Sequence, residues 1–189
     1  MLLLIIFIIV FIYIGIILFL NIYYPELRWN WNLIDTDNIK FPKGFIWGTA
    51  TASHQVEGGC DNNNWYKWER SIHKNGESCI SKGQKSGIAC DHWNRFSQDI
   101  KLIKELGVKS YRLSLEWSKI EPTQGNYDTN VIKHYHAIID TLIDNNIDPV
   151  ITLHHFTDPI WFHELGAFEK KINNKIFINY SKMIFVEFS

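Results

Sequence analysis

Residues 41–58 of this 189-residue chain read FPKGFIWGTATASHQVEG, and this is the most informative segment of the sequence. Aromatic residues open it, small residues follow, and polar residues, among them Gln55 and Glu57, then gather before a Gly-Gly turn. Small residues let neighbouring backbone approach closely, and polar groups at the end of a buried strand are where an α/β barrel builds its site. The stretch predicts an extended strand, about residues 45–53, whose end carries a polar site.

Strands and helices alternate after this point. Apolar residues spaced by three and four predict helices, and short apolar runs predict strands. The helices are expected at 91–106, 130–145 and 174–188, and the two further strands at 108–117 and 148–156. Asp91, and Asp128 or Thr129, are candidate helix caps, and Gly107 is a candidate terminator. Such an alternation indicates βαβ units and a parallel sheet, so the fold class is α/β.

A long polar segment, residues 58–90, separates the first strand from the first helix and carries Trp65 and Trp68. A loop of this length inside a compact domain is usually functional.

The second strand has an unusual pattern of charge. Side chains alternate across a strand, so Arg112, Ser114 and Glu116 share one side, and Tyr111, Leu113, Leu115 and Trp117 share the other. A charged row that points into a barrel is costly unless its members are paired or serve a site. Both a structural Arg112–Glu116 pair and a site role fit this pattern.

Two adjacent histidines, His154 and His155, stand on the third strand. Neighbouring positions on a strand point to opposite faces, so these two cannot close on one metal ion. Neither a metal nor a cofactor is predicted.

Four segments together, residues 41–58, 89–96, 111–122 and 150–161, resemble glycoside hydrolase family 1, the retaining β-glucosidase and β-galactosidase group. The resemblance covers about residues 40–188 and implies the first three βα units of a (β/α)8 TIM barrel. A complete barrel takes roughly 250 residues, so the barrel in this chain is incomplete.

The resemblance implies a role for each of four residues. Gln55 would hydrogen-bond hydroxyls of a β-linked sugar in the cleavage subsite, and His155 with Phe156 would be the sugar-binding histidine and the aromatic residue after it. Arg112 would lie beside the nucleophilic glutamate and hold it ionised. Thr157 stands where family members often have Asp, which leaves the sugar preference open.

The family's two catalytic carboxylates have no counterpart here. Retaining hydrolysis needs an acid/base and a nucleophile roughly 5 Å apart, and the family carries them in Asn-Glu-Pro and Glu-Asn-Gly elements that do not occur in this sequence. Four other glutamates match neither position and are interpreted as structural or rim residues: Glu57, Glu116, Glu121 and Glu164. No catalytic residue is predicted, and the chain alone is expected to be inactive.

Two functions follow as hypotheses. The chain is the N-terminal, sugar-binding part of a β-glycosidase, or it is a non-catalytic, membrane-tethered protein that binds carbohydrate or a partner. A small nucleotide-binding fold is disfavoured because neither G-x-G-x-x-G nor G-x-x-x-x-G-K-[S/T] occurs.

The first twenty residues are apolar and uncharged. About 20 such residues span a bilayer as a helix, and Tyr23, Tyr24 and Trp29 follow where an aromatic belt would lie. A signal peptide and a buried soluble helix are alternatives, but there is no basic residue before Arg28 and no small-residue cleavage site. We expect a single-pass membrane anchor of open orientation at residues 1–23, a linker at 24–40 and the partial barrel at 41–189, with secretion as the alternative.

The composition limits the kinds of binding partner that can be expected. A net charge of −1 gives no electrostatic basis for binding nucleic acid. Cys60, Cys79 and Cys90 suggest neither a disulfide framework nor a zinc site, although Cys60 and Cys79 could pair across a loop. Three strands of a barrel should leave two sheet edges and one open apolar face, which favours aggregation or a partner. The oligomeric state is left open.

Overall fold

The computed structural model describes residues 2–25 and 31–189, which divide into two units, Met1–Gly44 and Phe45–Ser189. The first unit holds helix α1 (Leu2–Tyr23) and two short 3-10 helices, η1 (Trp31–Leu33) and η2 (Thr36–Asn38). Leu3–Tyr23 has a mean hydropathy of 3.5 and is long and apolar enough to cross a membrane, a test that a signal sequence also passes. Part of the expected linker, with Arg28 and Trp29, lies outside the described residues.

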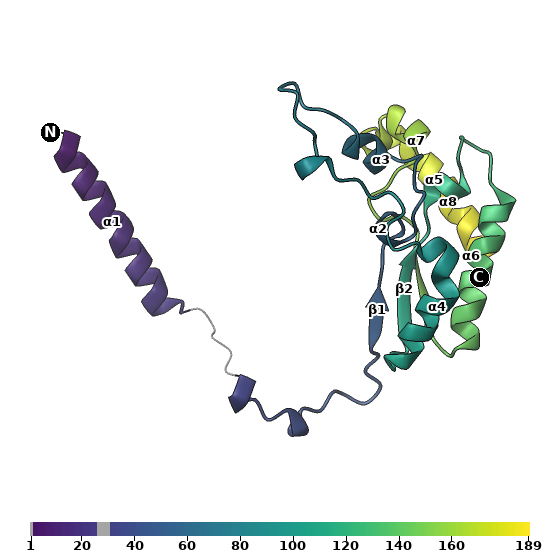
Figure 1. The fold of residues 1–189 in the computed structure, drawn as a ribbon, viewed down its shortest axis with the longest axis horizontal. Helices are drawn as coiled ribbons and strands as arrows, with labels where there is room; N and C mark the ends of the chain where they lie inside the picture. Colours follow the sequence, from purple (N-terminus) through teal and green to yellow (C-terminus); the bar gives the residue numbers. More distant parts are fainter. Residues whose placement is uncertain (1, 26–30) are drawn as a thin grey trace. The chain divides into compact units, whose positions relative to one another are not determined.

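The second unit is built on a parallel three-stranded sheet in the order β1 (Gly48–Ala50), β2 (Ser110–Ser114), β3 (Asp148–Thr152). Helix α4 (His92–Glu105) connects β1 to β2, α6 (Thr129–Asp144) connects β2 to β3, and α8 (Asn174–Glu187) follows β3. Helices α4 and α6 lie to one side of the strands (Figure 1). The predicted succession of strands and helices is confirmed.

Shorter elements join these units. They are α2 (Ser53–Val56), α3 (Asn64–Glu69), η3 (Ser81–Gly83), α5 (Trp117–Ile120), α7 (Ile160–Glu164), η4 (Ala167–Glu169) and η5 (Lys171–Asn173). The segment 58–90, predicted as a loop, is therefore partly helical.

All three strands end earlier than predicted. Ser53 begins α2 rather than ending β1, and Trp117 begins α5 rather than ending β2. At this edge the last backbone bonds run from the Thr51 N–H to Arg112 O and from the Leu115 N–H to Thr152 O, and beyond them the Ser53 N–H donates to the side chain Ser114 Oγ at 2.7 Å. The local apolar pattern does not record such a long-range side-chain bond, so it overestimates the strands.

The core lies between the sheet and the helices. Tyr111 and Leu113 on β2 are buried there, as the alternation predicted. Ile100, Ile138, Leu142, Tyr180 and Ile184 reach them from α4, α6 and α8. Trp117 stacks on Tyr180 with ring centroids 4.6 Å apart, so this side of the sheet is well packed.

The other face of the sheet is open except at its carboxyl edge, where Ser114 is buried. Ala50, Arg112 and Val150 occupy paired positions across the three strands and are all exposed. The remaining paired positions on this face hold Gly48, Ser110, Ser114, Asp148 and Thr152. The expectation of an open apolar face is therefore wrong, because small and polar residues make up most of it.

The helix ends follow the sequence signals in part. Asp128 Oδ1 accepts from the N–H groups of Asn130 (2.8 Å) and Val131 (3.2 Å), so this cap is confirmed. Gly107 has φ of +79°, as a C′ glycine should. Asp91 instead adopts φ of +56° and makes no side-chain cap bond. Its carboxylate accepts from Asn94 Nδ2 at 2.7 Å, so the predicted cap there is wrong.

Candidate functional site

Polar residues collect at the carboxyl edge of the sheet, where all three parallel strands end. Helix α2 follows β1, Glu116 follows β2, and His154 to Asp158 follow β3. Isolated pairing of Asn63 with Pro159 brings the segment before α3 to the same edge. This edge is where α/β folds bind ligands.

Glu116 is the most enclosed acid of this edge, with no exposed surface. Its Oε1 accepts from Ser118 Oγ at 2.7 Å and Asn63 Nδ2 at 3.3 Å. Its Oε2 accepts from Ser53 Oγ at 3.0 Å and Thr157 Oγ1 at 3.1 Å. Four donors from four segments therefore tie the three strand ends together.

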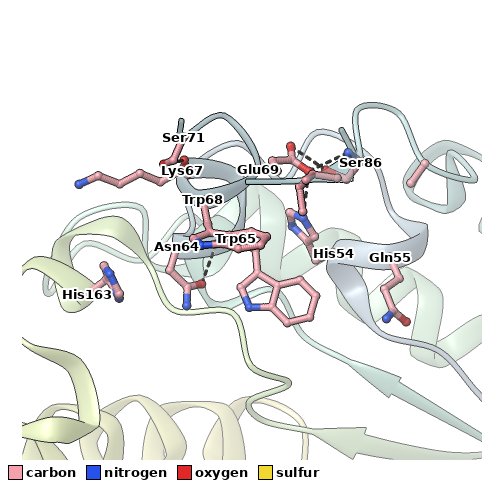
Figure 2. A pocket seen from close by; sticks show the side chains of 12 residues that line it. His54, Gln55, Asn64, Trp65, Lys67, Trp68, Glu69, Ser71, Ser86 and His163 are labelled. Atoms are coloured by element: carbon pink, nitrogen blue, oxygen red, sulfur yellow. Dashed lines mark hydrogen bonds and ion pairs between the residues drawn. The ribbon is translucent and has the colours of Figure 1, made fainter. Parts of the chain in front are cut away.

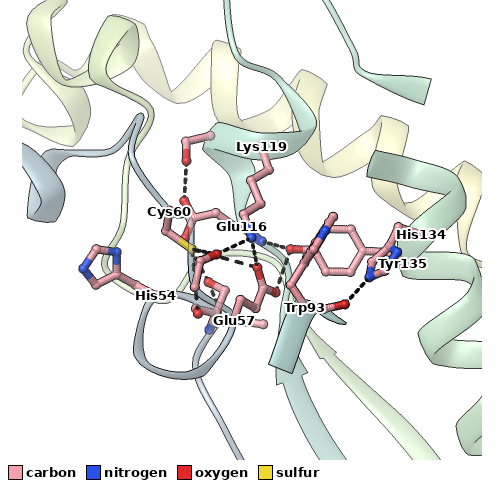
Figure 3. A network of polar contacts seen from close by, with 12 residues as sticks. His54, Glu57, Cys60, Trp93, Glu116, Lys119, His134 and Tyr135 are labelled. Atoms are coloured by element: carbon pink, nitrogen blue, oxygen red, sulfur yellow. Dashed lines mark hydrogen bonds and ion pairs between the residues drawn. The ribbon is translucent and has the colours of Figure 1, made fainter. Parts of the chain in front are cut away.

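Glu57 forms a second buried network beside it (Figure 3). Its Oε2 pairs with Lys119 Nζ at 2.9 Å, and Tyr135 OH donates to its Oε1 at 2.8 Å. Lys119 Nζ lies 3.9 Å from the centroid of the Trp93 ring, which adds a cation–π contact. Burial raises the pKa of Glu57 to about 7, against the opposing effect of Lys119. The acid is held in place from both sides.

The two remaining glutamates are also engaged. Glu121 is buried and accepts from Trp117 Nε1 and from the Gly125 N–H, both at 2.7 Å. Glu164 pairs with Lys67 at 3.0 Å on the surface. Each of the four glutamates thus has its own protein partners.

One buried cluster has donors of the kind that bind metals. His54, Cys60 and Glu116 each bring a ligand atom within 4.8 Å of the others. However, all four bonds to Glu116 come from neutral hydrogen-bond donors, and Asn63 Nδ2 contacts His54 Nδ1 at 3.0 Å. Burial raises the pKa of the Cys60 thiol, which opposes the thiolate form that a metal needs. Hydrogen bonding accounts for this cluster.

The three cysteines, Cys60, Cys79 and Cys90, are free thiols. The disulfide between Cys60 and Cys79 that the sequence left possible is therefore not formed.

A cavity of about 830 Å³ opens beside α2 and α3 (Figure 2). Gln55 lines one part of it, and Trp65 and Trp68 line another. Both tryptophans keep exposed surface, 38% and 51%. His54 and Glu69 lie deeper and are buried.

Of the three predicted sugar-binding residues, Gln55 lines this cavity, whereas Phe156 reaches its wall only through the ring of Trp65, and His155 contacts Phe156. Gln55 is exposed on α2, and the Trp65 ring lies parallel to Phe156 at 4° with centroids 6.3 Å apart. His155 meets Phe156 edge-on at 5.2 Å. Phe156 is 66% exposed and adopts φ of +68°, a conformation that costs a bulky residue energy.

The other predicted residues lie apart from this group. Arg112 is exposed on the open face of β2, and within the described residues it forms no ion pair with Glu116. The two histidines follow β3, which ends at Thr152, so the prediction that they stand on the strand is wrong. His154 pairs with Asp158 at 2.9 Å and meets the rings of Phe168 and Phe177 edge-on, whereas His155 contacts Phe156. Thr157 is buried and bonds to Glu116.

Sequence reasoning did not single out Asn63, Glu69 and Lys119 as members of this region, and it included His54 only as one of the polar residues that gather after the first strand. His54 is adjacent to Gln55, and Glu69 is adjacent to Trp68, so nearness to predicted site residues was the available signal. The contacts that place these residues in the site, such as the hydrogen bond from Asn63 to Glu116, join residues far apart in sequence and could not be predicted from local patterns.

The fold of the chain is similar to that of solved glycosidases. The Thermotoga maritima family 1 β-glucosidase superposes with a TM-score of 0.73 at 35% identity, over 79% of this chain and 34% of that one. The aphid myrosinase superposes with a TM-score of 0.73 at 32% identity, over 79% and 33%. The chain therefore has the arrangement of part of a TIM-barrel glycosidase, about a third of its length.

Sequence comparison gives the family. Residues 37–189 match the model of Glycosyl hydrolase family 1, and the chain belongs to that family. It is 38% identical over 150 residues to β-glucosidase A of Acetivibrio thermocellus, covering 78% of this chain and 33% of that protein. It is 36% identical over 152 residues to the cytosolic β-glucosidase of Homo sapiens, covering 78% and 32%. The chain spans about a third of the length of these relatives.

Proposed function

We propose that residues 45–189 form the sugar-recognition part of a retaining β-glycosidase. The observation that carries this proposal is the position of Gln55 and His155–Phe156 at one edge of the sheet, in a chain whose residues 37–189 match family 1. The T. maritima relative has been solved with a substituted glucoimidazole and with deoxynojirimycin, which are sugar-like ligands.

The side chains suit this role. The amide of Gln55 and the imidazole of His155 can each donate to one sugar hydroxyl and accept from another. The exposed rings of Phe156 and Trp65 offer apolar surface for the C–H face of a sugar. Arg112 would act on a nucleophilic glutamate supplied by another part of a complete barrel, where its positive charge would keep that acid ionised.

The 189-residue chain by itself should bind and not hydrolyse. The acid/base and the nucleophile have to be free to meet the glycosidic oxygen and the anomeric carbon. Glu57, Glu116 and Glu121 are buried and hydrogen-bonded, and Glu164 is paired with Lys67. Binding alone does not lower the barrier to the chemical step, because it stabilises substrate and transition state alike.

A membrane-tethered carbohydrate-binding protein is the alternative, and α1 favours it. This helix carries no charged residue and leaves its large apolar side chains exposed. We propose that it anchors the chain in a membrane. Both proposals share the sugar site and differ in whether a longer polypeptide supplies the two carboxylates.

The test uses the full chain, checked by intact mass, in a detergent without a sugar headgroup. We expect saturation-transfer NMR to detect binding of methyl β-glucoside to the chain. Gln55→Ala should abolish the saturation-transfer signal. Gln98→Ala, on the exposed face of α4, is the control and should leave the signal unchanged. Nitrophenyl β-glucoside should not be cleaved.

Two results would contradict the proposal. The first is absence of sugar binding by the folded chain. The second is turnover that Glu57→Gln, Glu116→Gln, Glu121→Gln or Glu164→Gln abolishes, which would identify one of these acids as catalytic.

A further inference from the structure

Phe156 adopts a backbone conformation that a bulky residue avoids. Its φ of +68° lies in the left-handed region, and the residue is 66% exposed, so burial of its ring does not offset the strain. Strained conformations of this kind persist only where surrounding contacts impose them, and they are frequent at ligand sites. The contacts that impose this one should therefore be identifiable in the fold.

Asn64, the first residue of α3, makes these contacts. Its Nδ2 donates to the carbonyl oxygen of Phe156 at 3.3 Å, although the two residues are 92 positions apart. Its Oδ1 accepts from the Asp158 N–H at 2.9 Å, and its own N–H donates to the Asp158 carbonyl oxygen at 2.9 Å. Three hydrogen bonds from one residue thus hold both ends of the segment 156–158.

Neighbouring positions of this segment are fixed from other directions. Thr157 Oγ1 donates to the buried carboxylate of Glu116 at 3.1 Å. The Ile160 N–H donates to the Asn62 carbonyl oxygen at 3.0 Å. Within the described residues, however, the bond from Asn64 is the only hydrogen bond to the backbone of Phe156. Its loss should therefore free Phe156 before it frees the residues that follow.

The position of Phe156 matters because its ring faces Trp65, the residue next to Asn64. The two rings are parallel to within 4°, and their centroids are 6.3 Å apart. The Trp65 N–H donates to Asn64 Oδ1 at 3.0 Å, a bond drawn as a dashed line in Figure 2. One asparagine side chain is therefore bonded to the backbone of both aromatic residues.

Direct contact with a ligand is the competing role, because Asn64 also lines the cavity. An asparagine side chain has two acceptor lone pairs and two N–H donors. Both lone pairs of Asn64 are used by the N–H groups of Trp65 and Asp158, and one donor is used by Phe156. A single donor is left for a ligand, so most of the hydrogen-bonding capacity serves the fold.

We propose that Asn64 is a positioning residue, which holds Phe156 in its left-handed conformation and so sets the arrangement of the Phe156 and Trp65 rings before a sugar binds. A ring that is already in place spares the ligand the cost of ordering it. His155 meets the Phe156 ring edge-on at 5.2 Å, so the same bonds also restrict the imidazole. The effect on sugar binding rests on the proposed function, whereas the effect on the two rings does not.

The test is a double-mutant cycle in the full chain, in a detergent without a sugar headgroup, with methyl β-glucoside as the probe. Asn64→Ala should weaken binding roughly three- to tenfold, as expected for the loss of one hydrogen bond. Phe156→Ala should weaken binding but leave it measurable, because Gln55 and His155 are still present. In that background, Asn64→Ala should cause no further loss of affinity, since the ring that it positions is absent.

A second readout follows the rings directly. Nuclear Overhauser effects between the Phe156 and Trp65 rings should be present in the unmodified chain and absent in Asn64→Ala. The matched control is Asn94→Ala, an exposed asparagine in the first turn of α4 whose Nδ2 donates to Asp91 at 2.7 Å. This change should leave both the affinity and the ring contacts unchanged.

Equal weakening by Asn64→Ala with and without the Phe156 ring would overturn the proposal and identify Asn64 as a ligand contact. Unchanged affinity and ring contacts, with only a lower free energy of unfolding, would also overturn it. If the folded, unmodified chain does not bind the probe, the proposed function is wrong, and the ring contacts still decide the role of Asn64. If Asn64→Ala does not fold, Asn64→Asp, which keeps an acceptor for the Asp158 N–H, takes its place with the same expected results.

Discussion

The hydroxyl of Tyr135 donates a 2.8 Å hydrogen bond to Oε1 of Glu57, although the two residues are 78 positions apart. The hydroxyl oxygen of Tyr135 in turn accepts from the Glu116 N–H at 2.8 Å. One phenol on α6 thus links both buried acids at the carboxyl edge of the sheet, so α6 helps to set the geometry of the site.

Tyr135→Phe should lower the free energy of unfolding by about 1–3 kcal/mol, because it leaves a buried carboxylate oxygen and a buried N–H each without a partner. Tyr180→Phe is the matched control: its hydroxyl is buried and has no hydrogen-bond partner in the described part of the chain. That change should be neutral or stabilising. Urea unfolding of the full chain in detergent measures both, and equal effects would contradict the role of Tyr135.

Glu57 should make stability depend on pH. Its pKa is raised to about 7 in the fold, from 4.5, mainly by burial. Between these values the folded state binds the proton and the unfolded state does not. Stability therefore falls as pH rises from about 4.5 to about 7, by roughly 3 kcal/mol, and is flat above that range.

Glu57→Gln should remove this slope. The measurement is the urea midpoint at about pH 5 and about pH 7.5 for both proteins, and the difference between the proteins isolates Glu57 from other titrating groups. A variant with the same slope as the unmodified chain would show that Glu57 titrates normally.

Two adjacent glycines should respond differently to Ala. Gly58 has φ of +81°, and a Cβ there would overlap the carbonyl oxygen of Ile88. Gly59 has φ of +63° with open space around it. Gly58→Ala should cost about 3 kcal/mol or more and Gly59→Ala about 1 kcal/mol, measured by thermal unfolding. Similar losses would mean that backbone strain, not the Ile88 contact, dominates.

In a polypeptide that carries the remaining barrel strands, Gln55→Ala and His155→Ala should each reduce turnover of an aryl β-glucoside. Each group is expected to bond hydroxyls more strongly in the transition state, at roughly 1.5–3 kcal/mol. Gln98→Ala and His73→Ala, both at exposed positions, are the controls. Steady-state kcat/KM is the readout, and values unchanged in both site variants would show that these roles do not apply here.

The anchor proposal predicts that the chain stays in the membrane fraction after carbonate extraction and needs detergent for release. The reason is that Leu3–Tyr23 has a mean hydropathy of 3.5 and no charge to favour water. Placing an Asp at Ile12, near the middle of this helix, should shift the chain toward the soluble fraction. Recovery of intact, N-terminally complete chain in the soluble fraction would exclude the anchor.

Sequence reasoning was most successful where a local signal decides the structure. The apolar face of α6 and its Asp128 cap are both determined by residues of this helix or next to it. Trp117 packs on the side of the sheet that strand alternation assigned to the core. The carboxyl edge was harder, because its short helices depend on bonds such as Ser53 to Ser114. The hydrogen bond between Glu57 and Tyr135 could not be predicted for the same reason, because the spacing of apolar residues does not indicate which distant tyrosine contacts a given carboxylate.

The backbone of Phe156 has a practical consequence for engineering. Its φ of +68° suits glycine, so a designer who sought only thermostability would replace this residue and relieve the strain. That choice would delete the ring that lies parallel to Trp65. Stability and ligand affinity therefore compete at this position, and variants selected for heat tolerance should be screened for sugar binding before they are kept.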